Sequence, residues 1–166
     1  MSSRRAASVG IISDTHGLVR PEALAAMKGA DLILHAGDVG APNVLEKLAE
    51  IAPLHAVRGN NDRGAWARCL PSTETVTLGD VRLLVVHDRS ELDGDPRSAG
   101  FHVVVSGHSH RPSIEKRDRV LWLNPGSAGP RRFHLPVSVA RLVVDGEAVR
   151  AKIVILDVAT ARPQRK

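Results

Sequence analysis

The first sixty residues alternate short apolar runs with segments of helical spacing. Apolar runs at residues 8–13, 31–35 and 54–58 have the length of buried strands. Between them, residues 21–28 and 43–50 carry apolar side chains at intervals typical of one helix face. Because a helical crossover normally joins parallel strands, this order predicts a β-α-β-α-β unit with a parallel sheet.

Beyond residue 70 the apolar runs are separated by turn signals instead of helical segments. Gly79-Asp80 and Asp145-Gly146 are dipeptides typical of two-residue hairpin turns. Residues 88–100 are polar and rich in glycine, and they predict a loop with at most one helical turn. The later strands are therefore expected to be antiparallel. They are predicted at residues 74–78, 81–87, 103–106, 113–116, 120–123, 137–144 and 149–156.

These patterns predict an α/β (α+β) fold whose helices cover the outer faces of the sheets. A length of 166 residues with 43% hydrophobic and 25% charged residues is typical of one globular domain, expected to span residues 1–166. Aromatic residues make up only 2% of the chain, so the core must consist of valine, leucine, isoleucine and alanine.

The formal charge of +5 comes from the two ends of the chain. Basic tails at about residues 1–7 and 160–166 hold five lysine or arginine residues, and the remainder has 18 basic and 18 acidic residues. Solvated ends are the simpler interpretation of these tails. A neutral body with few aromatic side chains for stacking argues against a nucleic-acid-binding module.

The compartment is expected to be the cytoplasm. Cys69 is the only cysteine, which excludes an intramolecular disulfide. No run approaches the roughly 20 apolar residues that a membrane-spanning helix needs. We therefore expect no membrane partner, and the sequence leaves open whether the chain forms a homo-oligomer.

Five short polar clusters directly follow predicted strands. In sheets with crossover connections, ligands gather outside the carboxyl ends of the strands, so clusters far apart in the sequence can converge on one place. Within a cluster, residues two positions apart in extended backbone point the same way. The clusters are Asp14-Thr15-His16, Gly37-Asp38, Gly59-Asn60-Asn61-Asp62, His87-Asp88 and Gly107-His108-Ser109-His110.

The side chains in these clusters form a mixed set of nitrogen and oxygen donors without thiolates. Such a set suits Mn²⁺, Zn²⁺, Fe, Co²⁺ or Ni²⁺ and differs from a structural zinc site built on cysteine. Seven donors are too many for one ion, but they suffice for two ions that share a carboxylate at about 3.5–4 Å separation. The candidate metal ligands are Asp14, His16, Asp38, Asn60, His87, His108 and His110.

The order D-x-H, G-D, G-N-x-D, a lone histidine after a strand, and G-H-x-H resembles the calcineurin-like metallophosphoesterases. The resemblance runs from about residue 9 to 132. Residues 124–127 (Asn-Pro-Gly-Ser) and 130–132 (Pro-Arg-Arg) are similar to the small single-domain bacterial and archaeal phosphodiesterase subgroup. This resemblance implies a two-sheet β-sandwich flanked by helices, in four layers of α/β/β/α type.

The resemblance also implies the chemistry. Asp14, His16, Asp38 and His110 would hold one divalent ion, and Asp38, Asn60, His87 and His108 would hold the other. Asp38 would bridge the two ions, for which Mn²⁺ is the first expectation. Asn60 and His87 are also assigned as catalytic residues. The expected activity is hydrolysis of a small phosphoester, foremost a phosphodiester, by a hydroxide that bridges both ions.

The chain departs from the family pattern at the proton donor. Many members have a histidine after the third-motif asparagine, whereas Asn61 stands here. Asn61, Arg131 and Arg132 are candidate substrate contacts, since an arginine can clamp a phosphate in bidentate fashion. His134 is a candidate replacement for the donor, although a surface histidine is the simpler interpretation.

Three further residues are candidates for supporting the site. His35 precedes Asp38 by three positions, and it is either a satisfied core histidine or a residue that orients a ligand. Asp62 is expected to orient neighbouring loop groups, and Asn124 to support a turn. The alternative function is a catalytically weak or silent scaffold or binding protein, as in the retromer subunit that resembles these enzymes.

Overall fold

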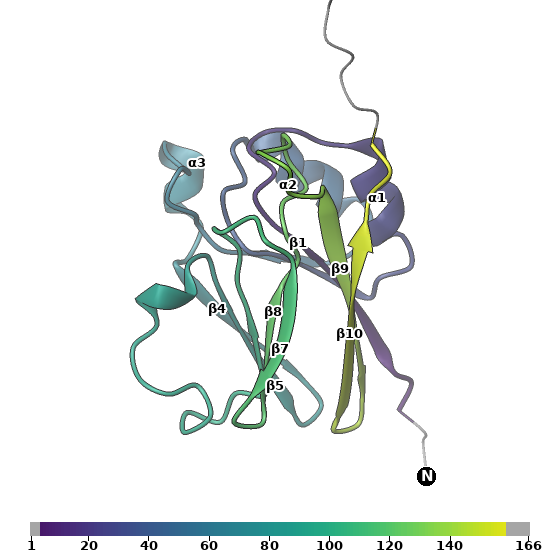
Figure 1. Ribbon diagram of the computed structural model, residues 1–166, viewed down its shortest axis with the longest axis vertical. Helices are drawn as coiled ribbons and strands as arrows, with labels where there is room; N and C mark the ends of the chain where they lie inside the picture. Colours follow the sequence, from purple (N-terminus) through teal and green to yellow (C-terminus); the bar gives the residue numbers. More distant parts are fainter. Residues whose placement is uncertain (1–3, 159–166) are drawn as a thin grey trace, which may run out of the picture.

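The computed structural model describes residues 4–158 and consists of two five-stranded mixed sheets packed face to face (Figure 1). The first sheet has the strand order β10-β9-β1-β2-β3, and the second has the order β4-β5-β6-β8-β7. The strands are β1 (Ala7–Ile12), β2 (Leu32–His35), β3 (Leu54–Ala56), β4 (Thr73–Leu78), β5 (Val81–Val86), β6 (Val103–Val105), β7 (Ser113–Arg117), β8 (Val120–Asn124), β9 (Ser138–Asp145) and β10 (Ala148–Ile155). The helices are α1 (Pro21–Met27), α2 (Pro42–Ala49), α3 (Ala65–Arg68) and the 3₁₀ turn η1 (Arg89–Glu91).

The first sheet contains the predicted parallel unit. Strands β1, β2 and β3 run parallel and are joined by α1 and α2, with Val9 paired to Leu32 and Ile33 to Leu54. The hairpin of β9 and β10 then returns to the other side of β1, where β9 pairs antiparallel to it. The amino-terminal and carboxyl-terminal strands therefore share one sheet, which closes the fold.

The second sheet differs from the sequence-based expectation in strand direction. The pairs β4–β5 and β7–β8 are antiparallel hairpins as predicted. However, β5 runs parallel to β6, and β6 runs parallel to β8. The expectation that all later strands are antiparallel is wrong here. Residues 87–102 form a crossover long enough to return the chain to the same end of the sheet, which a two-residue turn cannot do.

The core lies between the sheets and follows the alternation of side chains along each strand. Val9 and Ile11 of β1 point toward the second sheet, where they join Leu83 and Val105 in the larger cluster. Ile12 belongs instead to the cluster under the helices. Burial on both faces explains why the first strands appear in the sequence as continuous apolar runs.

Helices cover the two outer faces unequally. Met27 of α1 and Leu48 of α2 are buried against the outer face of the first sheet. On the second sheet, a small cluster that includes Val104 is packed by Leu92, which follows η1. The four-layer sandwich is thus confirmed with few helices. The single turn in residues 88–100 was predicted, whereas the four-residue helix α3 was not.

The ends of the chain bear on two earlier expectations. Strand β1 begins at Ala7, and the Arg5 guanidinium lies 3.3 Å from the Asp31 carboxylate. The carboxyl-terminal tail at residues 160–166 lies outside the described residues. Within residues 4–158, no helix has the length and apolar character needed to cross a bilayer.

The position of the core predicts the cost of truncating it. Leu34 of β2 is fully buried between the sheets, so Leu34→Ala should lower the free energy of unfolding by about 2–5 kcal/mol. Ile155 of β10 is 59% exposed, and Ile155→Ala should change it by less than about 0.5 kcal/mol. Urea unfolding of both variants measures the difference, and equal losses would contradict this description of the core.

Candidate metal centre

The five polar clusters predicted from the sequence lie in the loops at the carboxyl ends of β1, β2, β3, β5 and β6. Backbone hydrogen bonds hold these loops together. The amide of Asp14 donates to the Gly37 carbonyl at 3.0 Å, and the amide of His16 donates to the Asp38 carbonyl at 3.0 Å. In the second sheet, the amide of Gly107 donates to the His87 carbonyl at 2.9 Å. These hydrogen bonds hold neighbouring loops of each sheet together.

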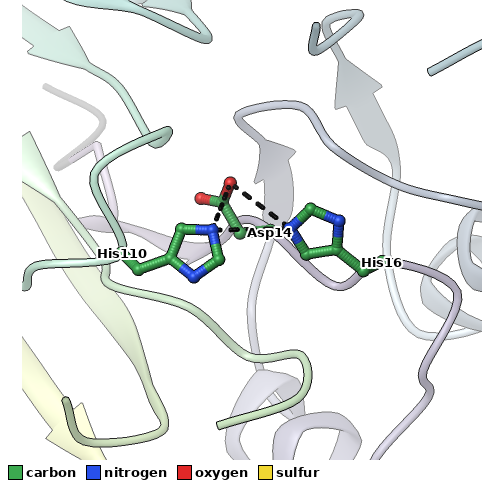
Figure 2. Close-up of side chains that lie close together, drawn as sticks. All are labelled: Asp14, His16 and His110. Atoms are coloured by element: carbon green, nitrogen blue, oxygen red, sulfur yellow. Dashed lines mark hydrogen bonds and ion pairs between the residues drawn. The ribbon is translucent and has the colours of Figure 1, made fainter. Parts of the chain in front are cut away.

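The first group of donor side chains consists of Asp14, His16 and His110, whose donor atoms all lie within 4.8 Å of one another. Figure 2 shows both imidazole rings directed at the Asp14 carboxylate. The Nε2 atoms of His110 and His16 lie 3.4 Å and 4.0 Å from Asp14 Oδ1, and 3.4 Å from each other. Residues from both sheets therefore meet here.

The second group surrounds Asp38 and contains three more candidate ligands. His87 Nε2 lies 3.4 Å from Asp38 Oδ2 and 2.9 Å from Asn60 Oδ1. His108 Nδ1 lies 3.3 Å from the same Asn60 oxygen. The structure therefore brings all seven candidate ligands into two adjoining groups.

The two groups overlap at the aspartates. By mutual distance alone, Asp14 belongs both with His16 and His110 and with Asp38 and His87. However, a single oxygen of Asp38, Oδ2, lies 3.8 Å from His16 and 3.4 Å from His87. Asp38 therefore faces one histidine of each group.

The backbone is strained at these residues. Five of the candidate ligands have positive φ angles: Asp14 (55°), His16 (46°), Asp38 (52°), His108 (70°) and His110 (61°). Residues other than glycine rarely adopt this region, and such conformations persist only where the surrounding structure enforces them. The surrounding fold thus holds these residues in an unfavourable backbone conformation, and this conformation sets the direction of their side chains.

The donor geometry fits divalent cations. Asp14 Oδ1 is buried and lacks a hydrogen-bond partner within residues 4–158, while two histidine nitrogens face it. His87 Nδ1 lies 2.8 Å from the Ala36 carbonyl, which can only accept, so Nδ1 carries the proton. In the neutral ring the Nε2 lone pair then faces the oxygens of Asn60 and Asp38. A cation between these atoms would remove their mutual repulsion.

The electrostatics of the second group favour positive charge. Burial acts to raise the pKa of Asp38, but contacts with His87 and with the amides of Asn61 outweigh it and hold that pKa well below its usual range. Burial acts to lower the pKa of His87, but Asp38 and the charge of Asp14 outweigh it and raise that pKa. The pair thus favours a negatively charged Asp38 beside a proton on His87.

Two polar side chains position the ligand loops. Asp62 does so as expected from the sequence, and Asn124, which was expected to support a turn, accepts a hydrogen bond from the Gly126 amide at 2.9 Å. The Asp62 carboxylate accepts hydrogen bonds from the amides of Val39, Gly40 and Gly59 at 3.2, 2.9 and 2.8 Å. The Asn124 side-chain amide donates to the Gly107 carbonyl at 2.9 Å. These bonds fix the loops of the second, third and fifth clusters.

Other positioning residues were missed in the sequence. The Ser13 hydroxyl donates to Asp14 Oδ2 at 2.8 Å, and the Ser127 hydroxyl donates to the Asp14 carbonyl at 3.0 Å. Buried serines carry no distinctive signal. Gly107 belongs to the same contact, because a Cβ there would collide with the Ser13 hydroxyl. The glycine is required by close approach of the two sheets.

His35 supports the loops rather than a ligand side chain. Its Nδ1 accepts a hydrogen bond from the Gly37 amide at 3.1 Å, so its Nε2 donates to the Thr15 hydroxyl at 3.0 Å. Thr15 in turn donates to the Val39 carbonyl at 2.8 Å. This fully buried chain of hydrogen bonds joins the loops that carry Asp14 and Asp38.

The candidate substrate contacts lie in two different parts of the structure. The backbone and side-chain amides of Asn61 each donate to the Asp38 carboxylate at 2.9 Å. Arg131, Arg132 and His134 lie together in an exposed loop, and their side chains make no hydrogen bond or ion pair within residues 4–158. Burial is the main cause that lowers the pKa of His16, and the charges of Asp38 and Asp14 act to raise it. The charge of Arg132 adds to the lowering.

Comparison with known proteins identifies the family. Residues 8–147 match the calcineurin-like phosphoesterase superfamily domain. The chain belongs to this superfamily. A probable metallophosphoesterase of Methanothermobacter thermautotrophicus is 35% identical over 158 residues, which cover 88% of this chain and 91% of that protein. A phosphodiesterase of Methanocaldococcus jannaschii is 27% identical over 137 residues, which cover 71% of this chain and 82% of that protein.

The fold comparison agrees with this assignment. Vps29 of Chaetomium thermophilum superposes with a TM-score of 0.73 at 20% identity, covering 89% of this chain and 97% of that one. At this identity the likeness concerns the fold alone. Membership of the calcineurin-like phosphoesterases supports a hydrolase that acts on phosphoesters with divalent metal ions, and the seven converging side chains are candidates to hold those ions.

The buried position of His35 predicts a pH dependence of stability in this phosphoesterase. Burial lowers the pKa of His35 to about 4, although the carboxylates of Asp14 and Asp62 act against it. Between that value and the unfolded value of about 6.5, the unfolded chain binds a proton that the folded chain does not. The free energy of unfolding should therefore fall with decreasing pH by about 3 kcal/mol from this residue.

Urea unfolding in the presence of a chelator tests this prediction. At neutral pH the wild-type protein should be more stable than His35→Gln, and the gap should close as the pH falls to about 4.5. His134→Gln, at an exposed position, is the matched control and should follow the wild-type curve. A gap between wild type and His35→Gln that stays constant with pH would show that His35 takes up its proton without penalty.

Proposed function

We propose that this chain is a phosphodiesterase whose centre holds two divalent metal ions, with Mn²⁺ as the first candidate. The observation that carries the proposal is the convergence of seven donor side chains from five loops around Asp38. When bound, two such ions lower the pKa of a water that bridges them to about 7 and clamp the oxygens of a phosphoryl group. The preference for diesters is supported by the phosphodiesterase relative from Methanocaldococcus jannaschii.

The assignment of ligands follows the two groups of side chains. Asp14, His16 and His110 would hold one ion, and Asn60, His87 and His108 would hold the other, with Asp38 shared. His87 is anchored at 2.8 Å on the Ala36 carbonyl, which leaves Nε2 free to ligate. Asn60 Oδ1 lies between the rings of His87 and His108 and would complete the second set.

A scaffold role has less support from the same geometry. A protein that only docks partners has no physical need for seven convergent donors, five of them on strained backbone. The hydrogen bonds that Asp62 accepts and that His35 forms with Thr15 likewise hold the loops that carry these donors. We therefore propose an enzyme, acting on a small phosphoester in the cytoplasm.

The decisive variant is Asp38→Asn. Replacing the shared carboxylate should lower both the metal content and the hydrolysis of bis(p-nitrophenyl) phosphate by about 100-fold or more, since even supporting residues of metal sites change affinity or activity 10–100-fold. Metal analysis after Mn²⁺ reconstitution and a spectrophotometric assay measure the two effects. Asp145→Asn is the matched control, because Asp145 is exposed and ends β9 at the opposite end of the first sheet.

Two results would contradict parts of this proposal. A wild-type protein with less than one ion per chain after reconstitution, and without turnover of either bis(p-nitrophenyl) phosphate or p-nitrophenyl phosphate, would exclude this activity. Full activity of Asp38→Asn would exclude the shared role of that carboxylate while leaving the reaction class in place.

The position of Asn61 predicts a dependence on the leaving group. Its side chain donates to Asp38, and an amide is no general acid, so nothing in the third loop protonates the departing oxygen. In a series of aryl methyl phosphates, kcat/KM should therefore fall steeply as the leaving-group pKa rises. His134→Gln should leave that slope unchanged. A shallow slope in the wild type that becomes steep in His134→Gln would identify His134 as the donor.

A further inference from the structure

A cavity of about 360 Å³ opens beside the metal centre, on the side of the second sheet. It lies between η1, the loop after β6, and strands β7 and β8. Its volume falls within the range of small-molecule binding pockets. Side chains that matter for its chemistry are Asp88, Arg89, His108, Arg111, Glu115 and Trp122.

Trp122 gives the cavity a flat aromatic wall. It lies on β8, packs against the buried cluster of Val86, Val104 and Val120, and also lines the cavity. The Arg89 guanidinium lies 6.0 Å from the centre of the Trp122 ring. A planar group entering here would meet an indole that packs against apolar side chains, together with a guanidinium that lies over the indole ring and can itself stack on planar groups.

Charged side chains of both signs line the cavity. They are the guanidinium groups of Arg89 and Arg111 and the carboxylates of Asp88 and Glu115, and Glu115 is also ion-paired with Arg117 at 3.1 Å. A pocket for a second phosphoryl group would need an excess of positive charge. Hydroxyl groups of Ser106 and Ser113 add donors and acceptors to the lining. The cavity therefore suits an uncharged planar group that can form hydrogen bonds.

His108 connects the cavity to the metal centre. Its Nδ1 lies 3.3 Å from Asn60 Oδ1 in the centre, and its Nε2 lies 3.6 Å from the Asp88 carboxylate in the cavity wall. A phosphoryl group bound at the centre would thus lie next to the cavity opening. One substituent of a phosphodiester could extend into it without crossing the protein.

We propose that this cavity binds a planar heteroaromatic group of nucleobase size, carried as the retained substituent of a phosphodiester substrate and stacked on Trp122. This rests on the phosphodiesterase activity proposed above. It adds a specificity-determining residue, Trp122, and a class of substrate, the nucleotide-like diesters.

Two substrates with the same leaving group test the proposal. Thymidine 5′-(p-nitrophenyl phosphate) carries a base, and methyl p-nitrophenyl phosphate does not. Trp122→Ala should raise KM for the thymidine diester about tenfold, the effect expected for loss of one stacked base, and leave the methyl diester unchanged. Trp122→Phe should restore most of the binding. Lys116→Ala, at an exposed position of β7 outside the cavity, is the control.

An equal change for both substrates, or no change for either, would overturn the proposal. Hydrolysis of the methyl diester reports on the metal centre separately, because this substrate does not reach Trp122. If neither diester is hydrolysed by the wild-type protein, the proposed phosphodiesterase activity fails, and the cavity is then judged by binding alone.

Fluorescence measures that binding without disturbing the cavity. In Trp66→Phe, Trp122 is the single tryptophan that remains. Adenosine 5′-monophosphate should quench its emission in a saturable manner, while ribose 5-phosphate at the same concentrations should not. Equal quenching by both compounds, or none by the adenine nucleotide, would show that no base stacks on Trp122.

Discussion

The contact on which the rest of the structure depends is the one between His87 and the loop after β2. His87 extends from the second sheet, binds the Ala36 carbonyl through Nδ1, and directs Nε2 at the carboxylate of Asp38 from the first sheet. The two sheets are thus joined by polar atoms at one end and by valine and leucine side chains elsewhere. The His87 imidazole and the Asp38 carboxylate are both buried, so the otherwise apolar sandwich contains a polar contact at this end.

Most of the fold could be predicted from the sequence because strands buried on both faces appear as continuous apolar runs. The strand directions in the second sheet could not. Hairpin dipeptides such as Gly79-Asp80 are local signals, whereas the parallel pairing of β5 with β6 depends on where the crossover of residues 87–102 returns. Helix α3 was missed because its four residues, Ala65–Arg68, are too few for a periodic pattern.

The donor side chains of the candidate site could be predicted because each follows a strand directly, and strand ends meet in space. The residues around them could not be predicted in the same way. Ser13 and Ser127 support Asp14 through single hydrogen bonds that leave no spacing in the sequence. Trp122 and Arg89 come from strand β8 and the 3₁₀ turn η1, and only the folded chain places them on one cavity. The convergence of the donor side chains could thus be predicted from the sequence, whereas the lining of the cavity could not.

The most direct test of the central claim is a crystal structure of the Mn²⁺-loaded protein with anomalous scattering measured for manganese. The account predicts two anomalous peaks about 3.5–4 Å apart, one beside His16 and His110 and one beside His87 and His108, with the Asp38 carboxylate between them. A single peak, or two peaks that Asp38 does not join, would contradict it.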